Sequence, residues 1–337
     1  MLAGVSSFAR ALIPVASTLL ACAHGATRPP PFGPSHWETA LDQATPLVGR
    51  IWEPRAGAFV GAAAVKESLA RADVVVLGET HDNPDHHLLQ AALLRALIAA
   101  GRRPALALEM LDVDQQGAVD AALGQPSPSA DALARAVGWE QSGWPAFALY
   151  RPILVAGIEA GLPVLAANLS RMQAKDVVHR GPQALGASVR GRLDQEGPLP
   201  EAVQKELREE MLASHCGMLP SRILDPMVLA QRARDAQMAD RIEPAAVARG
   251  VVLIAGDGHA RRDRGVPAFL LRGAPGLKVA SVAFLEVASD KRAPQDFAEE
   301  LGPALPFDFL IFTPRAQRED PCAGLRAHLE KVHQAAP

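Results

Sequence analysis

Acidic, amide and imidazole side chains follow four short apolar runs in this sequence of 337 residues. The runs span 73–77, 104–108, 163–167 and 251–255, and the polar residues at their ends include Glu79, His81, Glu109, Asn168 and His259. None of the runs alternates apolar with polar residues, so we expect strands buried on both faces, as in a parallel sheet. Because the carboxyl ends of parallel strands meet at one edge, we predict that these five side chains converge there.

Two glutamates and two histidines could bind a divalent metal ion and leave one coordination position open for water. In this interpretation Glu79, His81, Glu109 and His259 hold the metal, and one of the two glutamates is the general base of a hydrolase. No His-Glu-x-x-His or Cys-x-x-Cys spacing strengthens the metal hypothesis. The sequence also lacks a Gly-x-Ser-x-Gly elbow, a P-loop and a Rossmann fingerprint, which argues against a serine hydrolase, an NTPase and a dinucleotide enzyme.

These residues also have a purely structural interpretation. Glu109 and Asn168 could cap the helices that follow them, and the two histidines of the set could be core residues with satisfied hydrogen bonds. His86 and His87 open the next helix and could face solvent. Five such residues at four successive strand ends are more than capping requires, so we favour a ligand or metal site at this edge.

Helical stretches separate the apolar runs. We expect helices over Pro84–Ala100, Ala146–Ala160 and Met227–Glu243, the first with Asp82 or Asn83 as its N-cap. Weaker strand candidates follow at 278–285 and 307–312. The alternation of strands and helices predicts an α/β fold, a mostly parallel open sheet with flanking helices joined by right-handed crossovers.

The segment between Asn168 and Val251 is longer than one crossover needs. We therefore expect a small all-helical subdomain over about 170–245, inserted in a main domain that spans 49–320. Residues 321–337 then form a C-terminal tail.

The first residues have the pattern of a targeting segment. Residues 11–21 are apolar, too few for a transmembrane helix of ~20 residues but suited to a secretory signal. Leu19-Leu20-Ala21-Cys22 matches a lipobox, which predicts a lipoprotein signal peptide at 1–21, lipidation of Cys22 and a stiff tether over 22–48. Ala23 favours the outer membrane, facing the periplasm or the cell surface, with the lipid as the only membrane contact. An ordinary signal peptide with a chance cysteine is the alternative.

Composition and the remaining cysteines restrict the partners. Cys216 and Cys322 are an even pair in the oxidising compartment that export implies, and they could be bridged or remain two thiols. The 34 Lys and Arg residues nearly balance 37 Asp and Glu, so the charge gives no reason to expect a nucleic-acid partner. Aromatic residues make up only 4%, too few to suggest a platform for stacking bases.

Several motifs together resemble the ChaN-like haem-binding lipoproteins of the Tiki superfamily. The motifs are GETHDN at 78–83, LEM at 108–110, AAN at 166–168, HCGMLP at 215–220, AQRARDAQMADRI at 230–242 and GDGHARRDRGVP at 256–267. Paired Gly-x-x-His elements and a strand-end glutamate are part of the superfamily signature. The resemblance spans about 49–314, with the elements in the same order.

The resemblance implies a protein of bacterial haem and iron uptake that binds haem in a homodimer, two haems stacked face to face. An outer-membrane haem receptor would be a further partner. In the family a tyrosine, assisted by a histidine, binds the iron, which here indicates Tyr150, the only tyrosine, with His87 or His215. A phenolate suits ferric haem. Arg151 could pair with a propionate. Tyr150 could also be a half-buried helix residue, and Arg151 could simply face water.

Overall fold

The computed structural model describes residues 27–320 and 322–323. The predicted signal peptide and Cys22 therefore lie outside the described residues. Within the described part of the chain, no helix combines the length and apolar character that crossing a bilayer would require.

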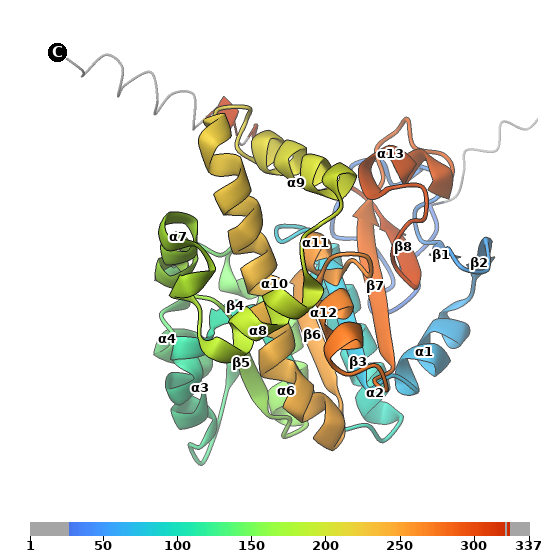
Figure 1. Cartoon of the computed structure of the whole chain (residues 1–337). Helices are drawn as coiled ribbons and strands as arrows, with labels where there is room; N and C mark the ends of the chain where they lie inside the picture. The colour runs from blue at the N-terminus through green and yellow to red at the C-terminus, as the bar shows by residue number, and fades with distance from the viewer. Residues whose placement is uncertain (1–26, 321, 324–337) are drawn as a thin grey trace, which may run out of the picture.

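An eight-stranded sheet forms the centre of the molecule (Figure 1). Its strands are β1 (Ile51–Glu53), β2 (Ala58–Val60), β3 (Val74–Glu79), β4 (Ala105–Asp112), β5 (Val164–Asn168), β6 (Val251–Gly256), β7 (Val279–Glu286) and β8 (Phe309–Thr313). They lie in the order β2-β1-β8-β7-β3-β6-β4-β5. The six strands from β8 to β5 run parallel, whereas β1 is antiparallel to both of its neighbours. This mostly parallel open sheet confirms the predicted α/β fold.

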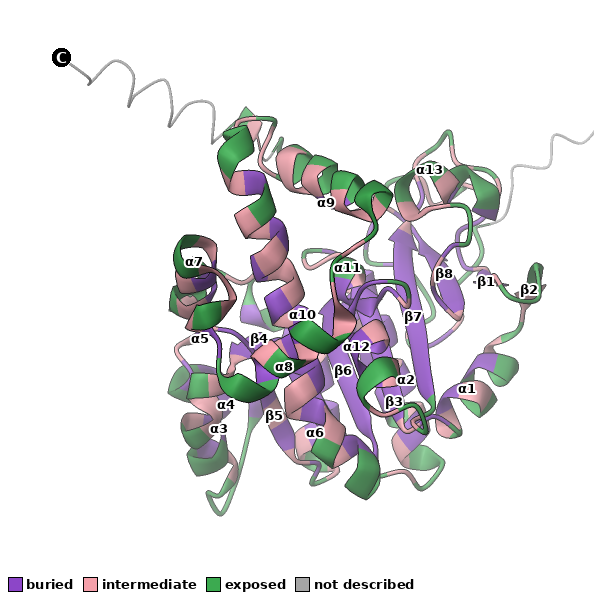
Figure 2. Cartoon of the chain, viewed as in Figure 1, coloured by how far each residue is buried: buried purple, intermediate pink, exposed green. Residues whose placement is uncertain are grey.

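The apolar runs became strands because both of their faces are covered. β3 and β6 are buried along their whole length, and Figure 2 shows the other parallel strands buried over most of theirs. Continuous burial is what a run without apolar–polar alternation predicts. The β1–β2 hairpin at the edge was not predicted, because strands of three residues are too short to show a pattern.

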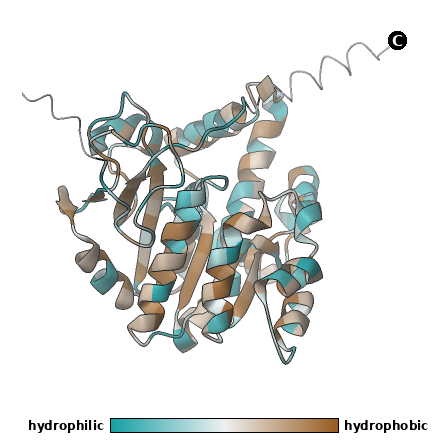
Figure 3. Ribbon diagram, turned by 180° about the vertical axis from the view of Figure 1, so that it is seen from behind, coloured by the Kyte–Doolittle hydropathy of each residue, from teal (hydrophilic) through white to brown (hydrophobic). Residues whose placement is uncertain are grey.

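Helices cover both faces of the sheet (Figures 1 and 3). On one face α1 (Ala62–Ala70) and α6 (Phe147–Glu159) pack against α2 (Pro84–Ala99). On the other, α10 (Ser221–Arg249) crosses β4, β5 and β6, and α12 (Val266–Gly273) packs on β7. The remaining elements are η1 (Val113–Gln115), α3 (Gln116–Leu123), α4 (Ala130–Ala136), α5 (Trp139–Ser142), α7 (Arg171–Arg180), η2 (Gly181–Ala184), α8 (Ala187–Glu196), α9 (Glu201–Ser214), α11 (Asp257–Ala260), η3 (Pro294–Phe297) and α13 (Ala298–Leu301).

One helix is longer than predicted. α10 runs through Pro226 and Pro244, which the sequence had suggested as the limits of a helix over Met227–Glu243. Each proline removes one backbone hydrogen bond. The buried face of α10, which includes Met238 and Ile242, packs on the sheet and on α7 and α8, and this contact keeps the helix continuous. Helices α7 to α10 fill the stretch in which a helical subdomain was expected.

The loop after β3 is fixed at both of its ends. Gly78 lies so close to α11 that a Cβ atom there would be 2.7 Å from the Cβ of Ala260, so only glycine fits. Asn83 is the N-cap of α2, its side chain accepting a hydrogen bond of 2.9 Å from the amide of Asp85. The amide of the same side chain donates to Glu286 at 2.6 Å, which attaches the loop to the end of β7.

α9 and the first turns of α10 project beyond the sheet (Figure 1). A disulfide joins Cys216, in the turn between these helices, to Cys322 near the C-terminus. The two cysteines, which sequence left as either a bridge or two thiols, are therefore bridged. Arg318 of the same C-terminal segment forms ion pairs with Asp82 and Glu286, so the segment also contacts the loop after β3.

We expect Cys322→Ser to lower the free energy of unfolding by about 2–4 kcal/mol, because a bridge that closes a loop of about 100 residues restricts the unfolded chain. The cysteines are 106 residues apart in sequence, and a loop of that length corresponds to at most about 5 kcal/mol, so we expect a loss near the upper end of this range. Urea unfolding of the wild type and the variant, each with and without dithiothreitol, measures the effect. If dithiothreitol lowered the free energy of unfolding of the variant as much as that of the wild type, the result would contradict this prediction.

Candidate functional site

The predicted convergence at the carboxyl edge of the sheet is present. Glu79 ends β3, Glu109 lies in β4, and His259 lies in α11, directly after β6. The three strands are neighbours, in the order β3-β6-β4. Their side chains form a buried cluster of two connected halves, one around Glu79 and one around Glu109.

The first half surrounds the fully buried carboxylate of Glu79. Oε1 lies 3.0 Å from Nδ1 of His81 and accepts a hydrogen bond of 2.8 Å from the hydroxyl of Tyr150. Oε2 lies 3.2 Å from Nδ1 of His87, an ion pair whose angle does not meet hydrogen-bond geometry. Burial disfavours the charged form, but the charge of His87 and the hydrogen bond to His81 hold the pKa of Glu79 well below its usual range.

The second half is a chain of three groups, Glu109, His259 and Asp235. Nε2 of His259 lies 3.2 Å from Glu109, and Nδ1 lies 2.6 Å from Asp235. Burial opposes the charged ring, but the two carboxylates raise the pKa of His259 to about 10. Burial also opposes the charge of Glu109, whose pKa the charge of His259 nevertheless lowers to about 2. The second oxygen of Glu109 accepts a hydrogen bond of 2.7 Å from the amide of Gly256.

His81 connects the two halves. A Cβ atom on Gly256 would lie 3.1 Å from the His81 ring and 3.7 Å from Glu109, so glycine lets the ring lie over the end of β6. Burial would lower the pKa of His81, but the hydrogen bond to Glu79 and the charge of Glu109 raise it to about 9. The side chain of His81 is 35% exposed and packs edge-on against Trp144, so it is the part of the cluster open to solvent.

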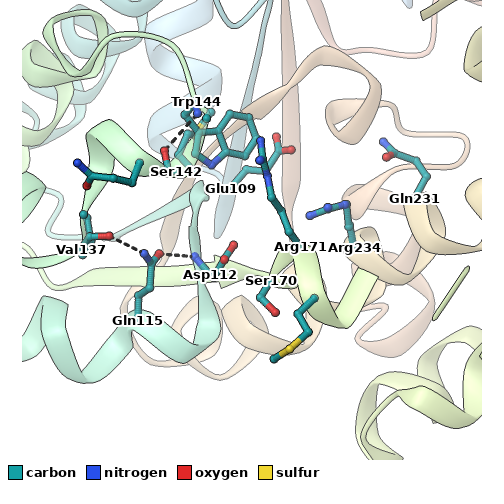
Figure 4. Close-up of a pocket in the computed structure, with 15 residues that line it drawn as sticks. Glu109, Asp112, Gln115, Val137, Ser142, Trp144, Ser170, Arg171, Gln231 and Arg234 are labelled. Carbon is teal, nitrogen blue, oxygen red and sulfur yellow. Dashed lines mark hydrogen bonds between the residues drawn. The ribbon is translucent and has the colours of Figure 1, made fainter. Parts of the chain in front are cut away.

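A cavity of about 730 Å³ adjoins the cluster, and we call it the Glu109 cavity. Its lining includes Glu109, Asp112, Trp144, Ser170, Arg171, Gln231 and Arg234. Figure 4 shows Glu109, Arg171, Arg234 and Gln231 around one space. Gln231 also lies 3.1 Å from Nε2 of His259, so the cavity reaches the buried acid–base groups.

A second cavity, of about 460 Å³, lies between α7, α9 and α10, and we call it the His215 cavity. Apolar side chains make up much of its lining: Ala174, Val178, Met211, Met227 and Ala230. Arg171, Gln231 and Arg234 belong to both linings and therefore separate the two cavities.

The structure brings most of the predicted site residues together. Asn168 joins the cluster by donating a hydrogen bond of 3.0 Å to the backbone oxygen of Glu109. His215 lies apart from the cluster, in the His215 cavity. Arg151 lies on the surface, where it pairs with Asp131 at 2.9 Å. His86 and His87 do not face solvent, because both are fully buried.

Tyr150 is buried under the cluster rather than exposed to a cavity. Its ring packs against those of His87 and Trp139, and its hydroxyl donates to Glu79. Burial and the Glu79 carboxylate raise the pKa of the phenol far above its usual range. In this arrangement Tyr150 is a neutral donor, and an iron bond to its oxygen would require the hydrogen bond to Glu79 to break.

The residues of the cluster do not fit a divalent metal as they are arranged. Among the residues that the structure describes, no three His, Cys, Asp or Glu side chains lie where they could share one ion. The rings of His81 and His259 instead face carboxylates at hydrogen-bond distance. An imidazole that carries both protons has no lone pair for a metal. The geometry suits proton transfer among the side chains themselves.

Sequence reasoning missed Asp235, Arg171 and Arg234. Asp235 and Arg234 lie in the motif at 230–242, where a polar pattern on a long helix does not show which side chains point inward. Arg234 donates to Asn168 and to the backbone of Leu169, each at 3.0 Å. Arg171 is the first residue of α7, and only the fold brings it beside Trp144.

The fold and the cluster together define an α/β protein with an open, mostly parallel sheet and a buried Glu/His cluster at its carboxyl edge. The family model described as haem-binding uptake, Tiki superfamily, ChaN matches residues 65–270. Because this match covers more than half of the chain, the protein belongs to that family. The resemblance seen in the sequence motifs is therefore confirmed.

A solved structure shows the same fold. ChaN of Campylobacter jejuni, whose structure is described as showing cofacial haem binding, is 22% identical, with a TM-score of 0.61 over 77% of this chain and 95% of that chain. An erythromycin esterase mutant in its open conformation is 15% identical over 77% of this chain and 95% of that chain, with a TM-score of 0.45. No curated protein matches the chain.

The raised pKa of His259 predicts a pH-dependent contribution to stability. The folded value of about 10 lies above the unfolded value of about 6.5, so the ion pairs of His259 stabilise fully below about pH 6.5 and are lost as the pH rises to about 10. We expect His259→Gln to cost about 3 kcal/mol near pH 6 and progressively less towards pH 10. Urea unfolding across this range measures it, with exposed His179→Gln as control. A penalty independent of pH would contradict the assignment.

Proposed function

We propose that this protein binds haem and that the His215 cavity holds it. The family to which the chain belongs supports haem as the ligand. The observation that carries the placement is the chemistry of the cavity: an apolar lining with one histidine, bordered by the cations Arg171, Lys175 and Arg234. Haem needs an apolar pocket for its macrocycle, an axial ligand for its iron and cations for its propionates.

His215 is suited to bind iron. Its Nδ1 donates a hydrogen bond of 2.8 Å to the backbone oxygen of Met211, which fixes the ring and places the lone pair on Nε2. Among the described residues, Nε2 has no hydrogen-bond partner. The neighbouring Cys216 is held by the disulfide, so the turn that presents His215 is anchored on its far side.

Tyr150 is the alternative ligand, with His87 in support. The family resemblance favours it, but its hydrogen bond to Glu79 would have to break first. The two ligands can be distinguished because their side chains lie in different parts of the molecule: His215 lines a cavity, whereas Tyr150 is buried.

We expect His215→Ala to weaken hemin binding at least about ten-fold, because loss of an axial ligand removes the bond that orients the iron. Tyr150→Phe should leave the affinity within about two-fold and leave the absorption spectrum of the ferric complex unchanged. Titration of the purified protein with hemin, followed by its Soret band, measures both, with exposed His179→Ala as the matched control. A large loss in Tyr150→Phe alone would assign the iron to Tyr150, and no loss in either variant would reject both ligands.

We further propose that the protein is exported, lipidated at Cys22 and attached to the outer membrane in haem and iron uptake. The lipobox supports the anchor, and the disulfide between Cys216 and Cys322 supports an oxidising compartment. A homodimer with two facing haems, and an outer-membrane haem receptor as partner, are proposals from the same family resemblance. Sedimentation with and without hemin tests the dimer.

Replacement of the lipidated residue should change where the protein is found. In bacteria that express the full chain, we expect the wild type in the membrane fraction and Cys22→Ser in the soluble fraction or still unprocessed. Both should remain oxidised at Cys216 and Cys322, which alkylation before and after reduction measures. Equal partitioning of the two chains would reject the lipid anchor.

A further inference from the structure

We propose that the Glu109 cavity is a binding site for a small organic monocarboxylate, held by the guanidinium groups of Arg171 and Arg234. This site lies on the other side of Arg171 and Arg234 from the proposed haem site and shares these two arginines with it. It follows from the charges of the cavity lining, its position beside the cluster and its polar character.

Two cations in this cavity have no acidic partner. Within the described residues, Arg171 takes part in no ion pair within 4 Å, and Arg234 bonds only to the neutral oxygens of Asn168 and Leu169. The side chain of Arg234 is half-buried, and Arg171 is exposed. A guanidinium held beside a cavity without a counter-ion favours an anion there, and its planar fork matches a carboxylate.

The charges of the lining favour one negative charge in the ligand. Of its two acids, Glu109 is already paired with His259 at 3.2 Å, whereas Asp112 has no cation within ion-pair distance among the described residues. The charges of Arg234 and Arg171 nevertheless act on the Asp112 carboxylate from beyond that distance, so Asp112 offsets about one of the two positive charges. A monocarboxylate balances the charge that remains, and a phosphate dianion would exceed it. The N-terminus of α7, at which Arg171 lies, adds to the positive potential.

The rest of the cavity is polar and fits a small molecule better than a macrocycle. Gln115, Gln141, Ser142 and Ser170 are neutral polar residues of the lining, and Trp144 adds a flat face. Gln115, Ser142 and Ser170 already form hydrogen bonds within the protein. A volume of about 730 Å³ lies in the range of small-molecule sites. The apolar surface that haem needs lies on the other side of Arg171 and Arg234, in the His215 cavity.

The site also faces groups that can respond to its occupant. Gln231 lines the cavity and contacts His259 at 3.1 Å, and Trp144 packs on His81. If the two arginines hold the carboxylate of the ligand, the rest of the ligand would point towards Glu109 and the cluster. The geometry assigns Arg171 and Arg234 to anchoring the carboxylate, with Gln231 on the same face of α10 as Arg234.

Ligand-observed NMR with benzoate and its neutral analogue benzamide tests the proposal on the purified protein. We expect benzoate to bind the wild type and benzamide to bind at least about ten-fold more weakly, since a hydrogen-bonded charge is lost. Arg171→Gln should weaken the affinity for benzoate by a similar factor. The variant should fold, because Arg171 makes no hydrogen bond within the described residues. Arg272→Gln, which removes an exposed arginine paired with Glu196, is the control and should bind as the wild type does.

Three results would overturn the proposal: equal binding of benzoate and benzamide, unchanged benzoate affinity in Arg171→Gln, or binding of inorganic phosphate in preference to benzoate. A second arm compares hemin with hemin dimethyl ester. If Arg171→Gln weakens hemin but not its ester, and benzoate does not bind, the arginine serves haem propionates and the free-ligand site is rejected. Haem binding itself is judged separately by His215→Ala, so either proposal can fail alone.

Discussion

The buried carboxylate of Glu79 determines how the edge of the sheet is built. An ionised carboxylate inside a protein is costly unless charges and hydrogen bonds compensate it. Here His81, His87 and Tyr150, which come from the loop after β3, from α2 and from α6, are all within 3.2 Å of its oxygens. Each of these elements must therefore keep its position for the carboxylate to be tolerated, and the sheet edge is fixed as one unit.

The same constraint explains the glycines and buried histidines around the cluster. Gly78 allows α11 to approach β3, and Gly256 allows the His81 ring to lie against Glu109. His86 accepts a hydrogen bond of 2.9 Å from the amide of Thr80 and lies 2.8 Å from the hydroxyl of Thr313, which ties the loop to β8. Burial keeps this ring neutral, with its pKa lowered to about 3. Two adjacent histidines thus differ in charge because only His87 faces a carboxylate.

The six parallel strands, and the meeting of Glu79, His81, Glu109 and His259, were predictable because continuous apolar runs and strand-end polarity are local signals. The burial of His86 and His87 was not, because their partners, such as Thr313 and Tyr150, are distant in sequence. The extent of α10 was missed for a related reason: packing on the sheet outweighs two prolines whose local effect is to end a helix. Unpaired arginines beside a cavity can be recognised only after the chain has folded.

The two cavities differ in polarity and in their position relative to the cluster. The acid–base groups of Glu109 and His259 are reached from the polar cavity, whereas the apolar cavity lies beyond Arg171 and Arg234 and has His215 in its lining. A haem in the apolar cavity would leave the ion pairs of Glu79 intact, whereas coordination by Tyr150 would take away one of the donors that stabilise this buried charge. The energetic constraint at Glu79 therefore favours an iron ligand outside the cluster.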